Sequence, residues 1–155
     1  MQSCTPLTLT LPDAEATDAL GTLLASYLVP GDTILLSGPI GAGKSHLSRA
    51  IIRARLGRME DVPSPSFTLV QTYEDDAGDI WHADLYRLTH PDDVLELGLD
   101  DAFDNSICLI EWPDRLGRFV PQNPIFLTLS AIGDGRQAEF RFAGRPALRK
   151  ALHHG

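Results

Sequence analysis

A glycine-rich segment, residues 38–45, constrains the fold of this chain more than any other feature: it reads Gly-Pro-Ile-Gly-Ala-Gly-Lys-Ser. The apolar run at 33–37 precedes it and has the composition of a parallel strand that is buried on both faces. After the segment, apolar residues recur at helical spacing from Leu47 to Ala54, and Gly57 ends the pattern. A strand, a G-x-x-x-x-G-K-S loop and a helix in this order predict a phosphate-binding loop.

The residue types in this loop suit a polyphosphate ligand. Glycines allow backbone N–H groups to converge on phosphate oxygens, and the helix N-terminus adds a partial positive charge. Lys44 would reach the β- and γ-phosphates, and the Ser45 hydroxyl would ligate Mg²⁺. Lys44 is one of only two lysines in a chain that otherwise uses arginine, which favours a position that needs a compact ammonium group. The alternative is a glycine-rich turn that merely joins strand to helix.

Two acidic residues are candidates for the magnesium and water side of such a site. Glu111 directly follows the apolar run 107–110, so it would emerge at the carboxyl edge of the sheet, where ligands collect. Asp84 lies in the segment 81–87, whose alternation is less clean. Phosphate-loop enzymes use such acids to hold Mg²⁺ or to orient the attacking water, and spacing alone leaves the division of roles open. The alternative makes Glu111 a solvent-facing carboxylate and Asp84 a surface partner of Arg87.

The remaining periodicity predicts an α/β fold with a mixed sheet, flanking helices and a closing C-terminal hairpin. Alternating or continuous apolar residues predict further strands at 5–11, 67–73, 80–86, 125–131 and 138–142. Asp13 would cap a helix that extends to Leu28, and 91–97 suggests a short helix. No linker or repeat divides the sequence, so we expect one domain over residues 1–155.

Composition narrows the possible partners and the compartment. The formal net charge of −8 makes the chain a poor stand-alone nucleic-acid binder, so a role in nucleic-acid chemistry would run through a protein partner. No apolar run approaches the roughly 20 residues of a membrane-spanning helix, and the first residues lack the pattern of a secretory signal. Cys4 and Cys108 form no close-spaced metal or redox motif. We expect a cytoplasmic protein with no membrane contact.

Other features have simple interpretations on the residues alone. The hydroxyls of 64–68 lie where a nucleotide-sensing segment would lie, but an ordinary Ser/Pro turn fits the spacing better. The D-x-x-G pattern at 75–78 falls in a polar turn, and the five histidines show no zinc-binding spacing. Trp112 is by default a core residue, and Arg136 is most simply a solvated charge.

Taken together, the motifs resemble one known family. The matches run in order along nearly the whole chain: 11–17, G-A-G-K-S at 41–45, S-P-S-F-T-L-V at 64–70, H-A-D-L-Y-R-L at 82–88, E-L-G-L at 96–99 and I-C-L-I-E-W-P at 107–113. In these elements the chain resembles the TsaE family (formerly YjeE), small ATPases of bacterial tRNA threonylcarbamoyladenosine synthesis. The D-L-Y-R-L and E-W-P elements are far more specific to that family than the phosphate loop.

The resemblance implies a P-loop NTPase fold and assigns roles by position. It implies ATP rather than GTP, with Ser45 and Glu111 as magnesium ligands and Asp84 as a second essential acid beside Lys44. The nucleotide-binding positions that it implies are Ile40, Gly41, Ala42, Gly43, Lys44, Ser45, Ser66, Trp112 and Arg136, with 13–17 near the adenine. Ser45 stands where threonine is commoner, and Pro39 where the family often has an acidic residue.

The resemblance also implies the biological role. Magnesium-dependent ATP hydrolysis would support two partner subunits, of the TsaB and TsaD type, that transfer threonylcarbamoyl to the adenosine beside the anticodon, so tRNA is reached only indirectly. Two alternatives stay open from the residues. One is a small-molecule kinase, for which 115–118 would be a minimal arginine-bearing lid. The other is a nucleotide-sensing adaptor without significant turnover.

Overall fold

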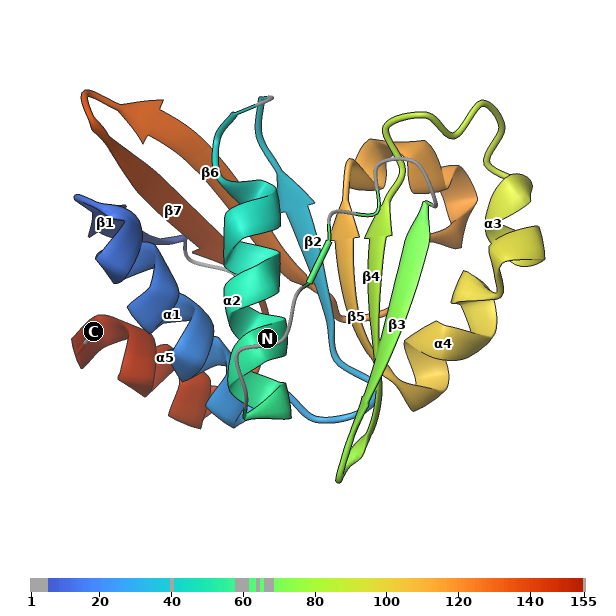
Figure 1. Cartoon of the computed structure of the whole chain (residues 1–155), viewed down its shortest axis with the longest axis horizontal. Coiled ribbons are helices and arrows are strands. Elements are labelled where there is room, and N and C mark those ends of the chain that lie inside the picture. Colours follow the sequence, from blue (N-terminus) through green and yellow to red (C-terminus); the bar gives the residue numbers. More distant parts are fainter. Residues whose placement is uncertain (1–5, 40, 58–61, 64, 66–68, 155) are drawn as a thin grey trace.

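The computed structural model describes residues 6–39, 41–57, 62–63, 65 and 69–154. In this part of the chain, seven strands form one sheet in the order β1-β7-β6-β2-β5-β4-β3 (Figure 1). The strands are β1 Leu7–Leu11, β2 Thr33–Ser37, β3 Val70–Asp75, β4 Gly78–Asp84, β5 Ile107–Glu111, β6 Ile125–Ile132 and β7 Gly135–Arg141. Strands β6, β2, β5 and β4 are parallel, whereas β1, β7 and β3 pair antiparallel with their neighbours. The predicted mixed α/β sheet is confirmed.

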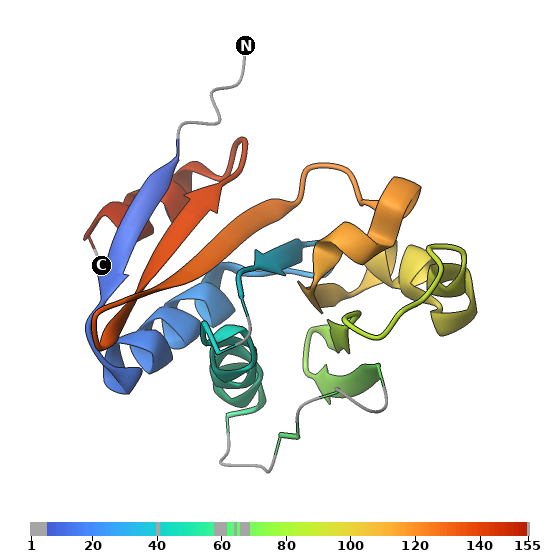
Figure 2. The same ribbon diagram turned by 90° about the horizontal axis from the view of Figure 1, so that it is seen from above.

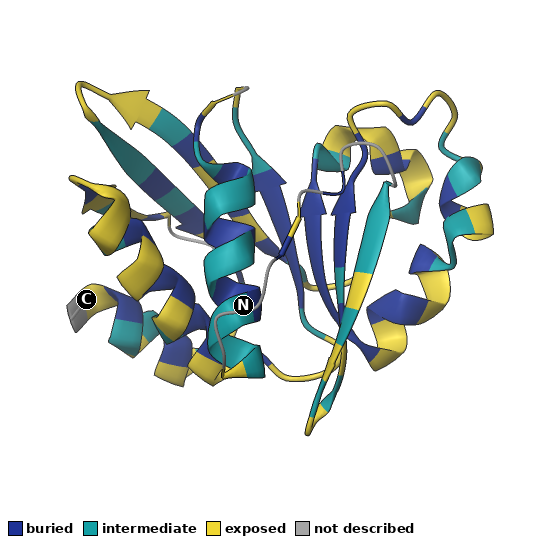
Figure 3. Cartoon of the chain, in the orientation of Figure 1, coloured by how far each residue is buried: buried dark blue, intermediate teal, exposed yellow. Residues whose placement is uncertain are grey.

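Helices cover both faces of this sheet (Figure 2). They are α1 Ala14–Tyr27, α2 Lys44–Leu56, α3 Asp93–Leu97, α4 Leu99–Asn105, the 3₁₀ segment η1 Pro113–Phe119 and α5 Pro146–His154. Successive strand residues point to opposite faces, so each face has its own core. Leu36 and Leu109 pack with residues of α1 and α2, whereas Leu35 and Ile110 pack with residues of α3, α4 and η1. The central strands β2 and β5 are consequently buried along almost their whole length (Figure 3).

The strongest sequence signals are the ones that the structure confirms. Asp13 caps α1, where its Oδ1 accepts a hydrogen bond of 2.9 Å from the Ala16 backbone N–H. Gly57 ends α2 in the left-handed conformation that favours glycine. The closing hairpin forms as predicted, with strands β6 and β7 joined at Gly133-Asp134.

The hairpin of β3 and β4 is offset from its prediction. The polar turn was expected to span 74–79, but β3 continues to Asp75 and β4 begins at Gly78. The turn is tighter because Oδ1 of Asp75 accepts hydrogen bonds from the backbone N–H groups of Ala77 and Gly78. The first residues of the predicted strand, 67 and 68, lie outside the described residues.

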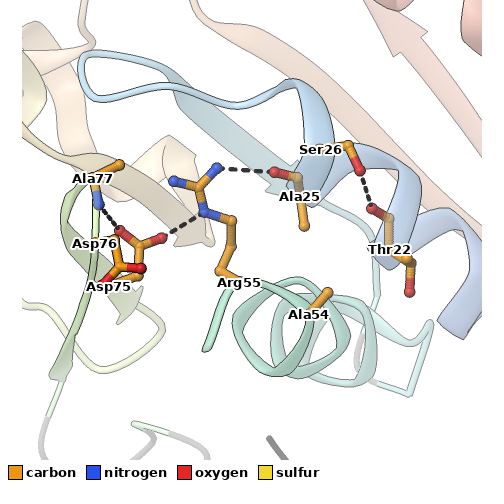
Figure 4. A pocket seen from close by; sticks show the side chains of 8 residues that line it. All are labelled: Thr22, Ala25, Ser26, Ala54, Arg55, Asp75, Asp76 and Ala77. Carbon is orange, nitrogen blue, oxygen red and sulfur yellow. Dashed lines mark hydrogen bonds and ion pairs between the residues drawn. The ribbon is translucent and has the colours of Figure 1, made fainter. Parts of the chain in front are cut away.

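Arg55, near the end of α2, joins this hairpin to both large helices (Figure 4). Its Nε donates to Oδ2 of Asp75 at 2.7 Å, and its Nη1 donates to the carbonyl oxygens of Ala25 and Leu28 at 2.9 and 2.8 Å. The last carbonyls of a helix lack partners within the helix, so Arg55 completes the end of α1. Ala25, Arg55 and Asp75 are among the residues that line a hollow of about 290 Å³. Strand β4 begins at this hairpin and ends at Asp84, a residue of the predicted site. The hollow and the predicted site therefore lie at opposite ends of β4.

The same bonds perturb the Asp75 carboxyl group. Burial, the largest effect, raises its pKa, but the hydrogen bonds from Arg55, Ala77 and Gly78 together outweigh burial and leave the pKa below its ordinary value. Asp75 therefore stabilises the fold in its ionised form.

Across the described residues, no helix has the length and apolar character needed to cross a bilayer.

Candidate functional site

The loop between β2 and α2 has the backbone that its glycines predict. Gly38 has φ of 139°, and a Cβ atom at this position would overlap the Leu129 carbonyl oxygen of β6, so only glycine fits. Gly43 is left-handed, with φ of 99°, and α2 begins at the next residue. The predicted strand–loop–helix unit is therefore confirmed for its described residues. Ile40 lies outside them.

The two candidate acids end adjacent parallel strands, as the sequence pattern predicted for Glu111. In the sheet register, Leu36 of β2 pairs with Glu111 of β5, and Glu111 pairs with Asp84 of β4. Both acids therefore lie level with Leu36, two residues before the phosphate loop begins at Gly38. Glu111 is 2% exposed and Asp84 is 8% exposed, so neither carboxylate faces the solvent, and the alternative that made Glu111 a solvent-facing carboxylate is wrong.

Ser45 lies directly against Glu111. The Ser45 hydroxyl donates to the Glu111 carboxylate, with Oγ at 3.0 Å from Oε1 and 3.1 Å from Oε2. A hydroxyl and a carboxylate are oxygen ligands of the kind that Mg²⁺ prefers, and Mg²⁺ usually takes its remaining ligands from phosphates and water. Among the described residues, no three His, Cys, Asp or Glu side chains cluster as a metal site of their own. The pair therefore fits a magnesium ion that arrives with a nucleotide.

Lys44 is buried at the start of α2. Its Nζ donates to the Gly38 carbonyl oxygen and lies 3.5 Å from the centroid of the Trp112 ring. Burial lowers the pKa of Lys44, and the nearby carboxylates of Glu111, Asp84 and Asp114 partly offset this effect. The ammonium group is therefore held between the loop, the acids and an aromatic face.

Trp112 is part of the site as well as of the packing around it. It is half-buried, follows Glu111 directly and adopts the left-handed conformation with φ of 61°. Its ring lies 4.9 Å from that of Tyr86, measured between centroids. The default interpretation as a core residue is therefore incomplete, because one part of Trp112 packs against the core and the ring also contacts Lys44.

Arg136 reaches the loop from β7. Its Nη2 donates to the Gly41 carbonyl oxygen at 3.1 Å, so the interpretation as a merely solvated charge is wrong. Next to it is a cavity of about 290 Å³ lined by Leu11, Asp13, Ala14, Thr17, Gly43, His46, Asp134, Gly135 and Arg136. The cavity adjoins the phosphate loop and includes members of the stretch 13–17.

Sequence reasoning missed one residue of the site, His82. Its side chain is fully buried, and its Nε2 lies 2.6 Å from Oε2 of Glu111. His82 precedes Asp84 by two residues on β4, so the two side chains share a face of the sheet. Strand periodicity was the signal that could have identified it. Ser66, the remaining candidate, lies outside the described residues.

Comparison with known proteins agrees with this arrangement. The sequence profile of the family "Threonylcarbamoyl adenosine biosynthesis protein TsaE" matches residues 11–138. The chain belongs to the TsaE family. TsaE of Rickettsia conorii is 38% identical over 128 residues, which is 83% of this chain and 73% of that protein. TsaE of Haemophilus influenzae is 34% identical over 139 residues, with 86% and 87% covered.

A solved structure of a family member has the same fold. The crystal structure of Bacillus subtilis YdiB superposes with a TM-score of 0.79 at 28% sequence identity, and the superposition covers 99% of this chain and 97% of the other. The Rickettsia and Haemophilus relatives are named as tRNA threonylcarbamoyladenosine biosynthesis proteins. The resemblance inferred from the sequence motifs is confirmed.

Proposed function

We propose that this chain binds ATP with Mg²⁺ at the edge of the sheet formed by β2, β5 and β4, and hydrolyses it. The observation that carries the proposal is the contact of the Ser45 hydroxyl with both carboxylate oxygens of Glu111, immediately after Lys44 in a glycine-rich loop. The phosphate-binding backbone, an ammonium group and a pair of oxygen ligands thus meet at one place. Each part suits a different portion of a magnesium–nucleotide complex.

The residues would divide the work as follows. The N–H groups of residues 41–45 and the Lys44 ammonium would bind and orient the phosphates. Ser45 and Glu111 would hold the magnesium ion, which, when bound, neutralises charge that develops on the phosphoryl oxygens. Asp84, one strand from Glu111, would accept a hydrogen bond from the attacking water and orient it. Arg136 and the cavity beside it would receive the nucleoside end.

The family suggests what the hydrolysis serves. We infer that the chain acts in tRNA threonylcarbamoyladenosine biosynthesis, as its relatives are named, and that it supports a transferase of two partner subunits of the TsaB and TsaD type. The net charge of −8 agrees with a protein that reaches tRNA through protein partners rather than through its own surface. On this proposal the chain is a cytoplasmic ATPase and not itself the transferase.

The kinase and adaptor alternatives have less support. The segment proposed as a minimal kinase lid is the 3₁₀ segment η1, in which Leu116 is fully buried and Arg118 bonds to Asp92 at 2.8 Å. An anchored segment of this kind does not resemble a lid that closes over a substrate. A non-hydrolysing adaptor would not need Asp84, a second acid buried beside Glu111.

The test is ATP hydrolysis by the purified chain, alone and with the two partner subunits, with and without Mg²⁺. We expect weak magnesium-dependent release of phosphate that rises when the partners are added. Strong activity indifferent to the partners would refute the role in the complex. A phosphorylated small-molecule product would indicate a kinase, and nucleotide binding without turnover under every condition would indicate an adaptor.

A further inference from the structure

His82 is a buried polar side chain that stands behind the proposed magnesium ligands. Its exposed fraction is 0%, and it lies on β4, on the same face of the sheet as Asp84. Its Nε2 is 2.6 Å from Oε2 of Glu111. The Glu111 carboxylate is thus contacted by His82 and by Ser45.

Among the described residues, the imidazole makes only this hydrogen bond, and its other nitrogen is unused. Within the described part of the chain, His82 Nδ1 is buried and has no hydrogen-bond partner. A buried polar atom without a partner destabilises the fold, so an apolar side chain would suit this place better if packing were the only demand. A carboxylate oxygen accepts hydrogen bonds, so in this pair the Nε2–H group is the donor. The function of His82 therefore resides in its bond to Glu111.

That bond restricts the orientation of the carboxylate. The last torsion of a glutamate side chain is broad, so Ser45 alone does not define the plane of the two oxygens. With Oε2 held by His82 and both oxygens near Ser45 Oγ, the plane is fixed toward the start of α2. Comparable groups behind metal ligands alter metal affinity or activity by about 10- to 100-fold when they are removed.

We propose that His82 is a positioning residue: its Nε2–H group holds the Glu111 carboxylate toward Ser45 and thereby sets how strongly Mg²⁺ enhances nucleotide binding. This inference rests on the proposed function and adds a residue to it. It requires that the donor stand at the Nε2 position, because the Nδ1 position has no contact with Glu111.

Two isosteric variants separate this role from a structural one. In His82→Gln the amide nitrogen can take the place of Nε2, whereas in His82→Asn the shorter amide reaches only the place of Nδ1. The readout is the dissociation constant of a fluorescent ATP analogue, measured with Mg²⁺ and with EDTA, without any need for turnover. We expect His82→Gln to stay within about 3-fold of the wild type, and His82→Asn to lose about 10-fold or more of the enhancement by Mg²⁺. Affinity in EDTA should stay within about 2-fold for both.

His82→Leu is a second variant without a donor at the Nε2 position, and its apolar side chain preserves packing in case His82→Asn does not fold. It should lose the magnesium enhancement as His82→Asn does, while thermal unfolding shows a folded protein. Equal magnesium enhancement in His82→Gln and in either variant that lacks a donor at the Nε2 position, or an equal loss of affinity with Mg²⁺ and with EDTA, would overturn the positioning role alone. If the wild type itself shows no enhancement by Mg²⁺, the proposed function fails and this inference with it.

Discussion

Replacing Arg55 with leucine should destabilise the protein far more than the loss of an ordinary surface charge. The side chains of Arg55 and Asp75 are 13% and 8% exposed, so the pair is largely shielded from water and its energetics are closer to those of buried ion pairs than of exposed pairs. The substitution leaves the Asp75 carboxylate buried without its charged partner, and it removes the donor to the carbonyl groups of Ala25 and Leu28. Breaking one side of a buried pair costs about 3–5 kcal/mol, which is the expected loss in the free energy of unfolding.

Urea and thermal unfolding, followed by circular dichroism, would measure this loss. For a domain of this size, each kcal/mol corresponds to about 2–4 °C, so Arg55→Leu should lower the melting temperature by about 6–20 °C. Arg49→Leu, on the same helix, is the matched control and should change stability by less than about 1 kcal/mol. Adding Asp75→Asn to Arg55→Leu should restore part of the loss, because the unpaired charge is then gone. The reasoning is refuted if Arg55→Leu is no less stable than Arg49→Leu.

Four further outcomes follow from the structure. Lys44→Ala should abolish nucleotide binding, and a titration with labelled ATP that shows unchanged affinity would contradict the role of its ammonium group. Glu111→Ala should impair magnesium-dependent hydrolysis more than ATP binding; equal losses of both would speak against its role as a metal ligand. Because the folded-state pKa of Asp75 is lowered, its stabilisation is complete well above the ordinary value of 3.8 and is lost as the pH falls below it toward the folded-state pKa. Asp75→Asn should therefore flatten the dependence of unfolding free energy on pH in that acidic range, and an unchanged slope would rule this out. Burial raises the pKa of the Cys108 thiol to about 12, so in a Cys4→Ser variant a thiol reagent should react only after unfolding, and rapid labelling of the native protein would disagree with its burial.

The elements predicted best were those in which one periodicity runs uninterrupted. Alternating and continuous apolar runs identified β2, β5 and the hairpin of β6 and β7. Apolar residues at helical spacing, together with Asp13 before α1 and Gly57 after α2, identified the two large helices. The helix α4 was missed because three of its seven residues are aspartates, so the segment reads as a polar loop. Its buried residues, Leu99, Ala102 and Phe103, make one helical turn, which is too short for a periodic signal.

The other missed elements lack a local signal for a different reason. In η1, Pro113 begins the segment and Gly117 interrupts it with a non-helical backbone. Proline and glycine in a sequence indicate a turn rather than a helix. In α5 the buried apolar residues are Leu148 and Leu152, set among basic and polar residues. Two apolar residues are too few to give a helical pattern in the sequence. They are buried because α1 and β1 pack against α5.

The site residues also differ in whether local sequence alone could predict them. Glu111 was predicted because an acid that directly follows a buried parallel strand must emerge at the carboxyl edge, and this argument needs only local sequence. The contact of Arg136 with Gly41 depends on β7 lying two strands from β2 in the sheet order, which no local pattern specifies. His82 lies between these cases: its face was predictable from Asp84, but its contact with Glu111 required the register of β4 and β5.

On the proposed function, the charges at this edge of the sheet would favour a nucleotide that carries a divalent cation. Lys44 and Arg136 contact the phosphate loop, whereas the buried carboxylates of Asp84 and Glu111 end the neighbouring strands, so two cations and two carboxylates border the loop. A pair of unit charges about 4 Å apart interacts by about 4 kcal/mol at the effective dielectric constant near a protein surface. Free polyphosphate would therefore gain from the cations and lose a comparable amount to the carboxylates. A bound Mg²⁺ reverses the second effect, because the carboxylates then face a positive ion, and for this reason the same two acids that repel free ATP would favour its magnesium complex.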